Sequence, residues 1–352
     1  MKAYNVGIIG YGWAAEAHIP AINATSLAQV TAICSSRQLD AREVSVKHGC
    51  PVKVYHDVPA LLADPDIHAV SICSYHQQHP EQVIAAAHAG KHIIVEKPLA
   101  LSLGDLRAVE QAVMRAGVKF CLCFELRFSA QFRAIKSILD SGQLGRLHYA
   151  EVDYYHGIGP WYREFKWCTT KADCGSSLLE AGCHALDALL LCVADDVEEV
   201  FTFGSKSGHP TYAPYEYPPS TVTLLQFKQG VIGKCASVID CWQPYYFHTH
   251  LVGSEGSLLD NRLHSNVLHG EDRQRWKELP FKPVDSGDVS DHPYQAQFEA
   301  FFAALAKGED MPLTSLRDAV RTHEVVFAAM RSAELKRPVN LQEVTRSRGN
   351  PG

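Results

Sequence analysis

Residues 4–37, YNVGIIGYGWAAEAHIPAINATSLAQVTAICSSR, decide the fold of this chain. A short apolar run over residues 6–9 predicts a strand, and it ends on a G-x-G-x-x-A fingerprint formed by Gly10, Gly12 and Ala15. Gly10 allows a tight turn, Gly12 lets a pyrophosphate approach the backbone, and Ala15 lets the next helix pack against the strand. The N-terminus of that helix offers N–H groups and a positive dipole end to phosphates. Because a second strand follows, the stretch predicts a dinucleotide-binding unit.

Composition and charge restrict the class of protein. The chain has 352 residues, of which 46% are hydrophobic and 20% charged, which is typical of a globular protein with two domains. A net charge of −6 without a long basic run argues against nucleic acid and anionic membranes as partners. No apolar stretch approaches the roughly 18 residues of a membrane-spanning helix, and the N-terminus enters a strand instead of a signal peptide. We therefore expect a cytoplasmic protein.

The eleven cysteines include no C-x-x-C pair, and most stand inside apolar runs, as Cys73 does. This pattern predicts buried thiols in a reducing compartment and disfavours a zinc site. His76 and His79 have a spacing that metal ligands can have, but they stand in a predicted loop and no C-x-x-C pair partners them. We therefore expect no metal and assign both histidines to a cofactor loop.

Strands and helices alternate up to about residue 122. Helices are predicted over residues 39–47, 58–63, 80–89 and 102–116, and strands over residues 52–55, 69–73, 92–95 and 119–124. Continuously apolar strands separated by helices indicate a parallel sheet that is covered on both faces. The expected fold of residues 1–122 is a doubly wound α/β Rossmann domain.

After residue 122 the pattern changes. Helices are predicted over residues 129–140, 175–192, 291–307 and 316–336, strands over residues 147–155, 197–203, 220–227, 230–240, 246–252 and near 256–268, and a loop over residues 156–174. Alternating polar and apolar side chains predict an open, mostly antiparallel sheet with one covered face. Residues 123–345 are expected to form an α+β domain that binds substrate and mediates oligomerisation.

The tripeptide Glu96-Lys97-Pro98 follows a parallel strand, at the end where ligands bind in such folds. The proline biases Lys97 towards an extended backbone, so that the direction of its side chain is fixed. We expect this ammonium group to lie near a nicotinamide and a substrate hydroxyl.

A second candidate group lies on the predicted helix over residues 175–192. Glu180 and His184 are four residues apart and share a helical face. Histidine is the side chain best matched to proton transfer near neutral pH, and the carboxylate can orient it. Gly182 between them lowers helix propensity and predicts the close approach of another group.

These motifs together resemble the Gfo/Idh/MocA family of NAD(P)-dependent oxidoreductases over almost the whole chain. The glycine turn is similar to the family's cofactor loop, residues 61–73 to its central stretch, and residues 179–187 to its active-site helix. The E-K-P tripeptide resembles its most specific short motif. The resemblance implies a Rossmann domain that binds NAD or NADP, followed by an α+β substrate domain.

Three positions depart from the family pattern. Glu180 stands where the family usually has Asp, His76 where it often has Asn, and Glu125 where it often has Asn two residues before an Arg-Phe pair. These departures concern contacts around the nicotinamide. The cofactor-binding residues that the resemblance implies are Gly10, Gly12, Trp13, Ala14, Ala15, Ser35, Ser36, Arg37, Ser74, His76, His79, Glu96, Lys97, Glu125 and Arg127.

Aromatic residues in the loop over residues 156–174 suggest a carbohydrate pocket, because aromatic faces stack on the C–H faces of sugars. The expected catalytic group consists of Lys97, Glu180 and His184, and these three residues are also expected to bind the substrate. The other expected substrate-binding residues are His156, Trp161, Tyr162 and Trp167.

The predicted function is an NAD(P)-dependent dehydrogenase that oxidises a secondary hydroxyl of a sugar, glycoside or cyclitol. His184 would move the hydroxyl proton. One alternative is a redox-cycling glycosidase or lyase of the same family, which regenerates its own cofactor. An alternative from another class is a non-catalytic nucleotide-sensing binding protein.

Two further expectations concern cofactor choice and assembly. Residues 34–37 at the end of the second strand contain no acid, so Ser35, Ser36 and Arg37 are expected to tolerate the 2′-phosphate of NADP; alternatively, Arg37 stacks on adenine. The strands over residues 221–227 and 231–239 carry apolar side chains on both faces, so a homodimer or homotetramer through this sheet is expected.

Overall fold

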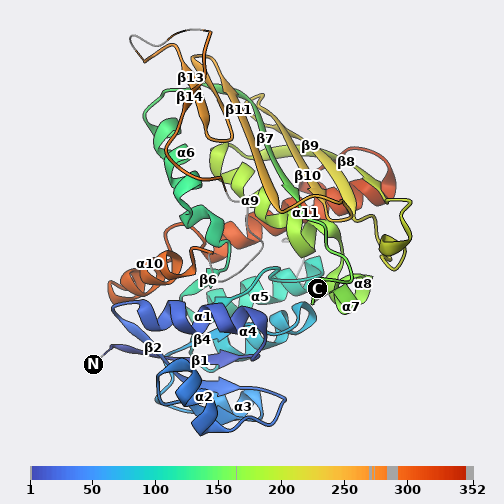
Figure 1. The fold of residues 1–352 in the computed structure, drawn as a ribbon. Helices are drawn as coiled ribbons and strands as arrows, with labels where there is room; N and C mark the ends of the chain where they lie inside the picture. The colour runs from blue at the N-terminus through green and yellow to red at the C-terminus, as the bar shows by residue number, and fades with distance from the viewer. Residues whose placement is uncertain (1, 164, 269–271, 273, 284–291, 346–352) are drawn as a thin grey trace. The chain divides into compact units, whose positions relative to one another are not determined.

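The computed structural model forms two compact units, described here one at a time (Figure 1). It describes residues 2–163, 165–268, 272, 274–283 and 292–345. The first unit contains residues 1–128 and 288–321, and the second contains residues 129–287 and 322–352. The first unit thus consists of two separate segments of the chain, and the predicted domain boundary after residue 122 lies six residues before the end of the first segment.

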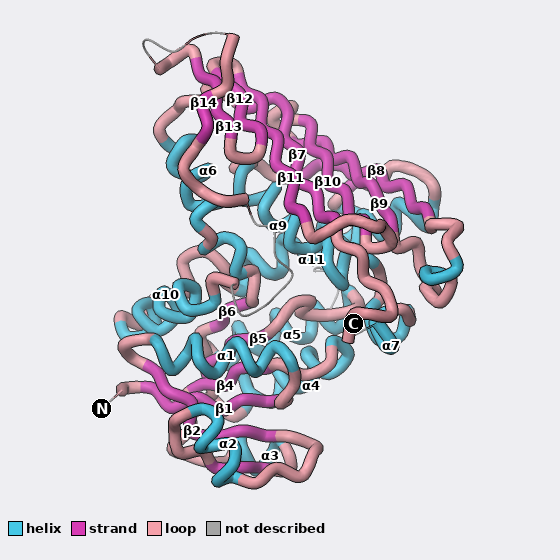
Figure 2. The backbone as a smooth tube through the Cα atoms, viewed as in Figure 1, coloured by secondary structure: helices cyan, strands magenta, loops and turns pink. Residues whose placement is uncertain are grey.

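The first unit is built on a six-stranded parallel sheet in the order β3-β2-β1-β4-β5-β6 (Figure 2). Its strands are β1 (Tyr4–Ile9), β2 (Ala28–Cys34), β3 (Lys53–Tyr55), β4 (Ala69–Ile72), β5 (His92–Val95) and β6 (Phe120–Leu122). The strand order reverses between β1 and β4, which is where ligands bind in doubly wound sheets. The predicted α/β fold of the N-terminal part is confirmed.

Helices of the first unit begin and end close to the predicted positions. They are α1 (Trp13–Ala24), α2 (Ala41–His48), α3 (Val58–Leu62), α4 (His79–His88), α5 (Leu103–Ala116) and α10 (Tyr294–Ala306), with the 3₁₀ turns η1 (His76–Gln78) and η2 (Glu125–Phe128). Asp57 and Ser102 cap α3 and α5 by accepting backbone N–H bonds. Gly49 and Gly117 end α2 and α5 in the left-handed conformation. The predicted start of α10 at Asp291 lies outside the described residues.

The core of the first unit explains why α10 belongs to it. Helix α10 contacts α1, and its Phe298, Phe301 and Phe302 are almost completely buried. The Phe302 ring stacks on Tyr4 of β1 with 5.7 Å between centroids. Burial of several aromatic rings contributes on the order of several kcal/mol. Through this packing, α10 joins the unit of the N-terminal sheet although it lies far away in the sequence.

The second unit is built on a nine-stranded mixed sheet in the order β14-β13-β12-β11-β7-β10-β9-β8-β15. Its strands are β7 (Leu147–Tyr155), β8 (Val197–Ser205), β9 (Ser220–Phe227), β10 (Ile232–Val238), β11 (Tyr246–Gly253), β12 (Gly256–Leu259), β13 (Arg262–Ser265), β14 (Lys277–Glu278) and β15 (Val339–Asn340). The β7–β10 pair is parallel and the other neighbours are antiparallel, as the sequence predicts for a mostly antiparallel sheet. The two-residue strands β14 and β15 were not predicted, because they are too short to show a period.

Helices of the second unit depart from prediction around residue 175. They are α6 (Ala130–Asp140), α7 (Phe165–Cys168), α8 (Lys171–Cys174), η3 (Leu178–Gly182), α9 (Cys183–Cys192), η4 (Pro210–Tyr212) and α12 (Gln342–Thr345), while α11 (Leu316–Leu335) carries residues of both units. The predicted loop over residues 156–174 contains the four-residue helices α7 and α8. The predicted helix over residues 175–192 begins with the π-helical turn η3. Single turns of these kinds carry no periodic signal that a sequence could show.

The two faces of the second sheet differ. Helices α6 and α9 lie on one side of it (Figure 2), and α9 contacts β7 and β10. On β9, Val222 and Leu224 alternate with buried residues, and 38% and 46% of their surfaces are exposed. The outer face therefore carries apolar side chains over β9.

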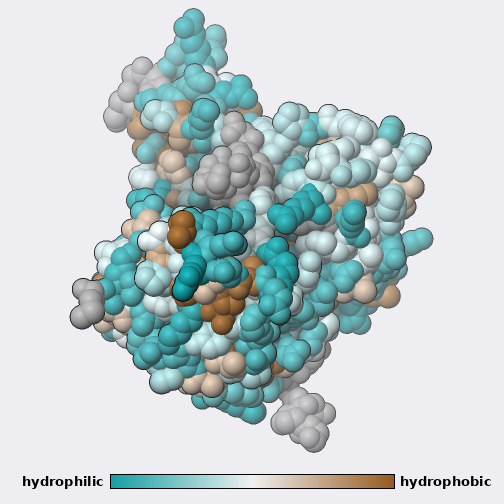
Figure 3. Space-filling view, turned by 60° about the horizontal axis from the view of Figure 1, so that its bottom comes forward, coloured by the Kyte–Doolittle hydropathy of each residue, from teal (hydrophilic) through white to brown (hydrophobic). Residues whose placement is uncertain are grey.

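The surface is mostly polar in the view of Figure 3, where hydrophobic residues form small patches among hydrophilic ones. Among the described residues, every helix is too short or too polar to cross a bilayer. All eleven cysteines are present as thiols, and nine of them are buried.

Candidate active site

The glycine turn after β1 has the two properties that a bound pyrophosphate requires. Gly10 has a φ of +89°, and a Cβ on it would lie 2.8 Å from the carbonyl carbon and oxygen of Cys73. Only glycine fits there. A Cβ on Gly12, in contrast, would meet nothing within 4 Å, and this residue caps α1 without a side-chain hydrogen bond. Open space in front of the N-terminus of a twelve-residue helix fits the pyrophosphate of a dinucleotide.

The predicted neighbours of this turn lie in the same unit. Ala15, in the first turn of α1, is fully buried, whereas Trp13 and Ala14 are half-buried. At the end of β4, the Ser74 hydroxyl donates to Gln82 Oε1 at 2.6 Å. The ends of β1 and β4 are adjacent, because Cys73 N donates to the Ile9 carbonyl at 2.8 Å.

The end of β2 is held against the glycine turn by Arg37. Its guanidinium donates to the Tyr11 carbonyl and lies 5.7 Å from the centre of the Tyr11 ring. The Ser35 hydroxyl accepts from Arg37 N at 3.1 Å, and Ser36 is exposed. A cation and a hydroxyl group therefore stand where NAD-specific sites usually place an acid.

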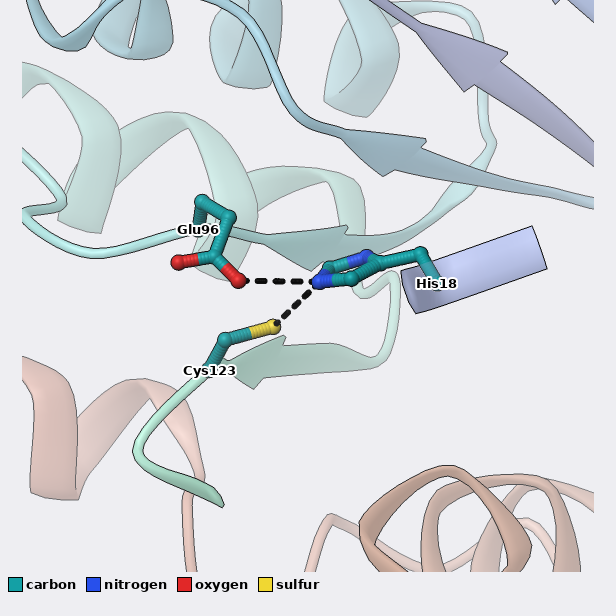
Figure 4. A group of neighbouring side chains, drawn as sticks. All are labelled: His18, Glu96 and Cys123. Carbon is teal, nitrogen blue, oxygen red and sulfur yellow. Dashed lines mark hydrogen bonds and ion pairs between the residues drawn. The ribbon is translucent and has the colours of Figure 1, made fainter. Parts of the chain in front are cut away.

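Glu96, at the end of β5, belongs to a buried hydrogen-bond network (Figure 4). Its Oε1 lies 2.8 Å from His18 Nε2 and accepts the Tyr294 hydroxyl at 2.8 Å. Its Oε2 accepts from Lys97 N at 3.1 Å. His18 Nδ1 lies 2.8 Å from the Ser71 hydroxyl.

Two cysteines complete the surroundings of His18. Cys73 Sγ lies 3.3 Å from His18 Nδ1, and Cys123 Sγ lies 3.9 Å from Nε2. The network joins α1, three strand ends and α10, and it fixes the backbone that carries Lys97.

The charges of this network are those of a buried ion pair. Burial by itself lowers the pKa of His18, but the adjacent Cys73 sulfur and Glu96 outweigh it and raise this pKa to about 10. Burial by itself raises the pKa of Glu96, whereas His18 and Lys97 lower it to about 2. At neutral pH the imidazolium and the carboxylate are therefore both ionised.

The two predicted loop histidines differ in their contacts. The ring nitrogens of His79 lie 2.7 Å from the Pro98 carbonyl oxygen and 3.1 Å from that of Ser74. His79 therefore joins the β4 loop to the E-K-P turn. Burial and the nearby charge of Lys97 hold the pKa of His76 well below its usual value, so this imidazole is neutral.

Glu125 and Arg127 on η2 are both buried and face the second segment of the unit. Glu125 Oε1 lies 3.1 Å from His292 Nδ1. Arg127 Nη1 donates to the Leu313 carbonyl at 2.5 Å and lies 3.3 Å from Asp318 Oδ1. These contacts attach the described residues 292–321 of the second segment, and binding of a cofactor by Glu125 and Arg127 stays a prediction.

In the second unit, the segment that carries Glu180 and His184 is packed tightly on β10. A Cβ on Gly182 would lie 2.5 Å from Ser237 Cβ, so the predicted close approach at this glycine is confirmed. Glu180 lies in the π-helical turn η3, where Oε2 accepts from Cys174 Sγ at 2.5 Å. His184 follows in the first turn of α9 and is buried. π-helical turns are frequent at functional sites.

The aromatic loop brings some of the predicted substrate residues together. His156 Nδ1 lies 3.0 Å from the Tyr154 hydroxyl, and the His156 ring lies edge-on to Tyr162 at 5.1 Å. Trp161 is 56% exposed, and its ring lies 5.1 Å from that of Trp242.

Trp167 lies in the separate helix α7 and is half-buried. Sequence patterns assign no role to His18, Tyr294 or Trp242. The only available signal was a histidine within the apolar helix that follows the glycine turn.

Two family models match the chain. Residues 4–124 match an oxidoreductase family with an NAD-binding Rossmann fold. Residues 132–259 match the GFO/IDH/MocA C-terminal domain.

Relatives of known name extend the similarity to the whole length. A myo-inositol 2-dehydrogenase of Thermotoga maritima is 27% identical over 96% of this chain and 99% of its own. A 1,5-anhydro-D-fructose reductase of Ensifer adhaerens is 27% identical over 86% of this chain and 91% of its own. The crystal structure of a probable dehydrogenase from Thermotoga maritima superimposes with a TM-score of 0.81 at 27% identity, covering 97% of this chain and 99% of the other.

Proposed function

The chain belongs to the Gfo/Idh/MocA family of oxidoreductases and carries its NAD-binding Rossmann domain, and from this we propose that it is a dehydrogenase of a sugar, glycoside or cyclitol. The reaction is the oxidation of a secondary hydroxyl to a ketone, or the reverse. Relatives named for a cyclitol and an anhydro sugar support this substrate class.

The observation that carries the proposal is the fixed end of β5. Glu96 is held by His18 and Tyr294, and its second oxygen accepts from Lys97 N. The backbone of Lys97 is therefore fixed at the carboxyl edge of a sheet whose glycine turn fits a pyrophosphate. A bound nicotinamide supplies the acceptor for a hydride.

We further propose that Lys97, Glu180 and His184 act on one substrate hydroxyl. The Lys97 ammonium binds and polarises the oxygen, and His184 accepts its proton while the hydride leaves the same carbon. Glu180 orients the imidazole or binds a neighbouring hydroxyl. In the reverse direction, His184 returns the proton to the ketone oxygen.

A substrate screen tests the proposed function. Purified protein is mixed with NAD or NADP and with single cyclitols, anhydro sugars and glycosides, and the absorbance of the reduced nicotinamide is followed. The proposal expects net cofactor reduction with at least one cyclitol or sugar. Release of the leaving group from a glycoside without net cofactor reduction would indicate the redox-cycling reaction instead of a dehydrogenase. Cofactor binding with neither reduction nor release of a leaving group would favour a nucleotide-sensing protein.

Three finer properties are proposed alongside this function. NADP is accepted as well as NAD, because Ser35 and Arg37 stand at the end of β2 without an acid in residues 34–37. The outer face of the second sheet pairs with a second copy of the chain, since it exposes Phe203, Val222 and Leu224. Eleven thiols suit the reducing environment of the cytoplasm.

A further inference from the structure

The outer face of the second sheet carries a polar cluster that has no part in the proposed reaction. The cluster consists of Glu151 and Asp153 on β7, Lys234 on β10, His248 and His250 on β11, and Asp260 in the turn between β12 and β13. Residues 150, 152 and 154 alternate with the two acids of β7 and are buried on the side of α9. All members of the cluster lie in the second unit.

Three of these residues bring ligand atoms together. Glu151 faces His250 directly in the antiparallel ladder between β7 and β11, and His248 stands two residues before His250 on the same face. One ligand atom of each residue lies within 4.8 Å of the others. The side chains of Glu151 and His248 keep 14% and 21% of their surface exposed in the single chain.

Asp260 orients one of the two imidazoles. Its Oδ1 lies 3.1 Å from His248 Nδ1 and accepts from Thr249 N at 3.0 Å, and its Oδ2 accepts the Tyr246 hydroxyl at 2.7 Å. When Nδ1–H donates to this carboxylate, the lone pair of His248 is on Nε2, which lies 3.9 Å from Glu151 Oε1. A carboxylate behind a histidine in this way is typical of metal ligands.

We propose that Glu151, His248 and His250 bind a divalent transition-metal ion of the Zn²⁺ type, with water completing its coordination. Zinc bonds to imidazole nitrogen and carboxylate oxygen measure about 2.0–2.2 Å. The ligand atoms must therefore approach one another by roughly 1 Å, which side-chain rotation supplies. The sequence predicted no metal, because that expectation rested on cysteine spacing, whereas this site uses two histidines two residues apart on one strand.

The surrounding charges favour a cation. Glu151, Asp153 and Asp260 supply three carboxylates, and Lys234 supplies one ammonium group. Lys234 Nζ lies 2.6 Å from Glu151 Oε1 and 2.7 Å from Asp153 Oδ2. An ion on Glu151 Oε1 displaces Lys234 from one oxygen only, and Asp153 keeps the ammonium group.

The two imidazoles differ in how readily they offer a lone pair to an ion. Burial lowers the pKa of His250, so this imidazole is neutral at pH 7. The hydrogen bond to Asp260 raises the pKa of His248. Since metal ligands must be deprotonated, the ion has to displace a proton wherever His248 is charged.

Metal titration of the full-length protein tests the site. After removal of metals with a chelator, Zn²⁺ is titrated calorimetrically, and Co²⁺ is added separately and followed by its absorption spectrum. The proposal expects Co²⁺ bound by nitrogen and oxygen, without a thiolate-to-cobalt charge-transfer band. His248→Ala and His250→Ala should each weaken Zn²⁺ binding at least tenfold, and Asp260→Asn about 10–100-fold.

His148→Ala is the matched control, because this exposed histidine is on the same strand as Glu151 but on the opposite face. It should leave Zn²⁺ affinity unchanged. Circular dichroism of each variant separates loss of the site from loss of the fold. A thiolate band in the cobalt spectrum, or unchanged affinity in folded His248→Ala/His250→Ala protein, would overturn the proposal. The dehydrogenase activity plays no part in the test.

Discussion

His184 is the residue on which the proposed chemistry depends most. If it is the base, His184→Ala should lower turnover by roughly two to four orders of magnitude. Cofactor affinity should barely change, because the glycine turn belongs to the other unit. Steady-state kinetics and fluorescence titration with NADH measure the two quantities. Glu180→Gln should cost less turnover than His184→Ala, and near-normal turnover in His184→Ala would make Lys97 the first candidate for the base.

Arg37 tests the proposed acceptance of NADP. Its guanidinium is exposed and already lies beside the glycine turn, on the Tyr11 carbonyl. Arg37→Ala should weaken NADP binding about tenfold relative to NAD, the size expected for one hydrogen bond to a charged group. Parallel titrations of both cofactors give the ratio. An equal loss for NAD and NADP would instead indicate that Arg37 stacks on adenine or supports the turn, and exclusion of NADP by more than about a hundredfold in the parent protein would end the proposal.

The ends of the parallel strands depend on the His18–Glu96 pair for their stability. Folding lowers the pKa of Glu96 from 4.5 to about 2. Its contribution to the free energy of unfolding is therefore present above pH 4.5 and is lost as pH falls towards 2. Folding raises the pKa of His18 from 6.5 to about 10. Its contribution to the free energy of unfolding is therefore complete below pH 6.5 and is lost as pH rises towards 10. The pair therefore stabilises the first unit most between about pH 4.5 and 6.5.

Urea denaturation across this pH range checks the expectation. His18→Leu should destabilise the protein by about 3–5 kcal/mol near pH 6, because it leaves the Glu96 charge buried without its ionic partner. The double variant His18→Leu/Glu96→Gln should lose less stability than His18→Leu, and its free energy of unfolding should depend less on pH than that of the parent protein. A profile of the double variant that parallels the parent protein would assign the pH dependence to other groups.

Assembly of the whole molecule is proposed to use the outer face of the second sheet. Leu224 is 46% exposed on β9, and Leu224→Glu places a charge in this apolar area. The substitution should shift the light-scattering mass of the protein towards a monomer at micromolar concentration. Met114→Glu is the control, since Met114 is an apolar residue that is 69% exposed on α5 of the first unit, outside the second sheet. A parent protein that is already monomeric would contradict the proposal.

Local sequence determined the parallel sheet of the first unit and the helices over residues 13–116, but not that α10 belongs to this unit. The glycine turn, the helix caps at Asp57 and Ser102, and the left-handed Gly49 and Gly117 are all effects between near neighbours. Continuous apolar strands then allow only a sheet covered on both faces. In the second unit, alternation alone predicted the mostly antiparallel sheet, because each strand buries one face.

Tertiary structure decided what depends on distant contacts. The ion pair of His18 and Glu96 joins residues that are 78 positions apart, and Tyr294 completes it from another segment. The proposed metal site requires the register of β7 on β11, which sets Glu151 opposite His250. Strand period shows which face a side chain takes, but hydrogen bonding between strands decides which side chains meet, and that information is not local to any stretch of sequence.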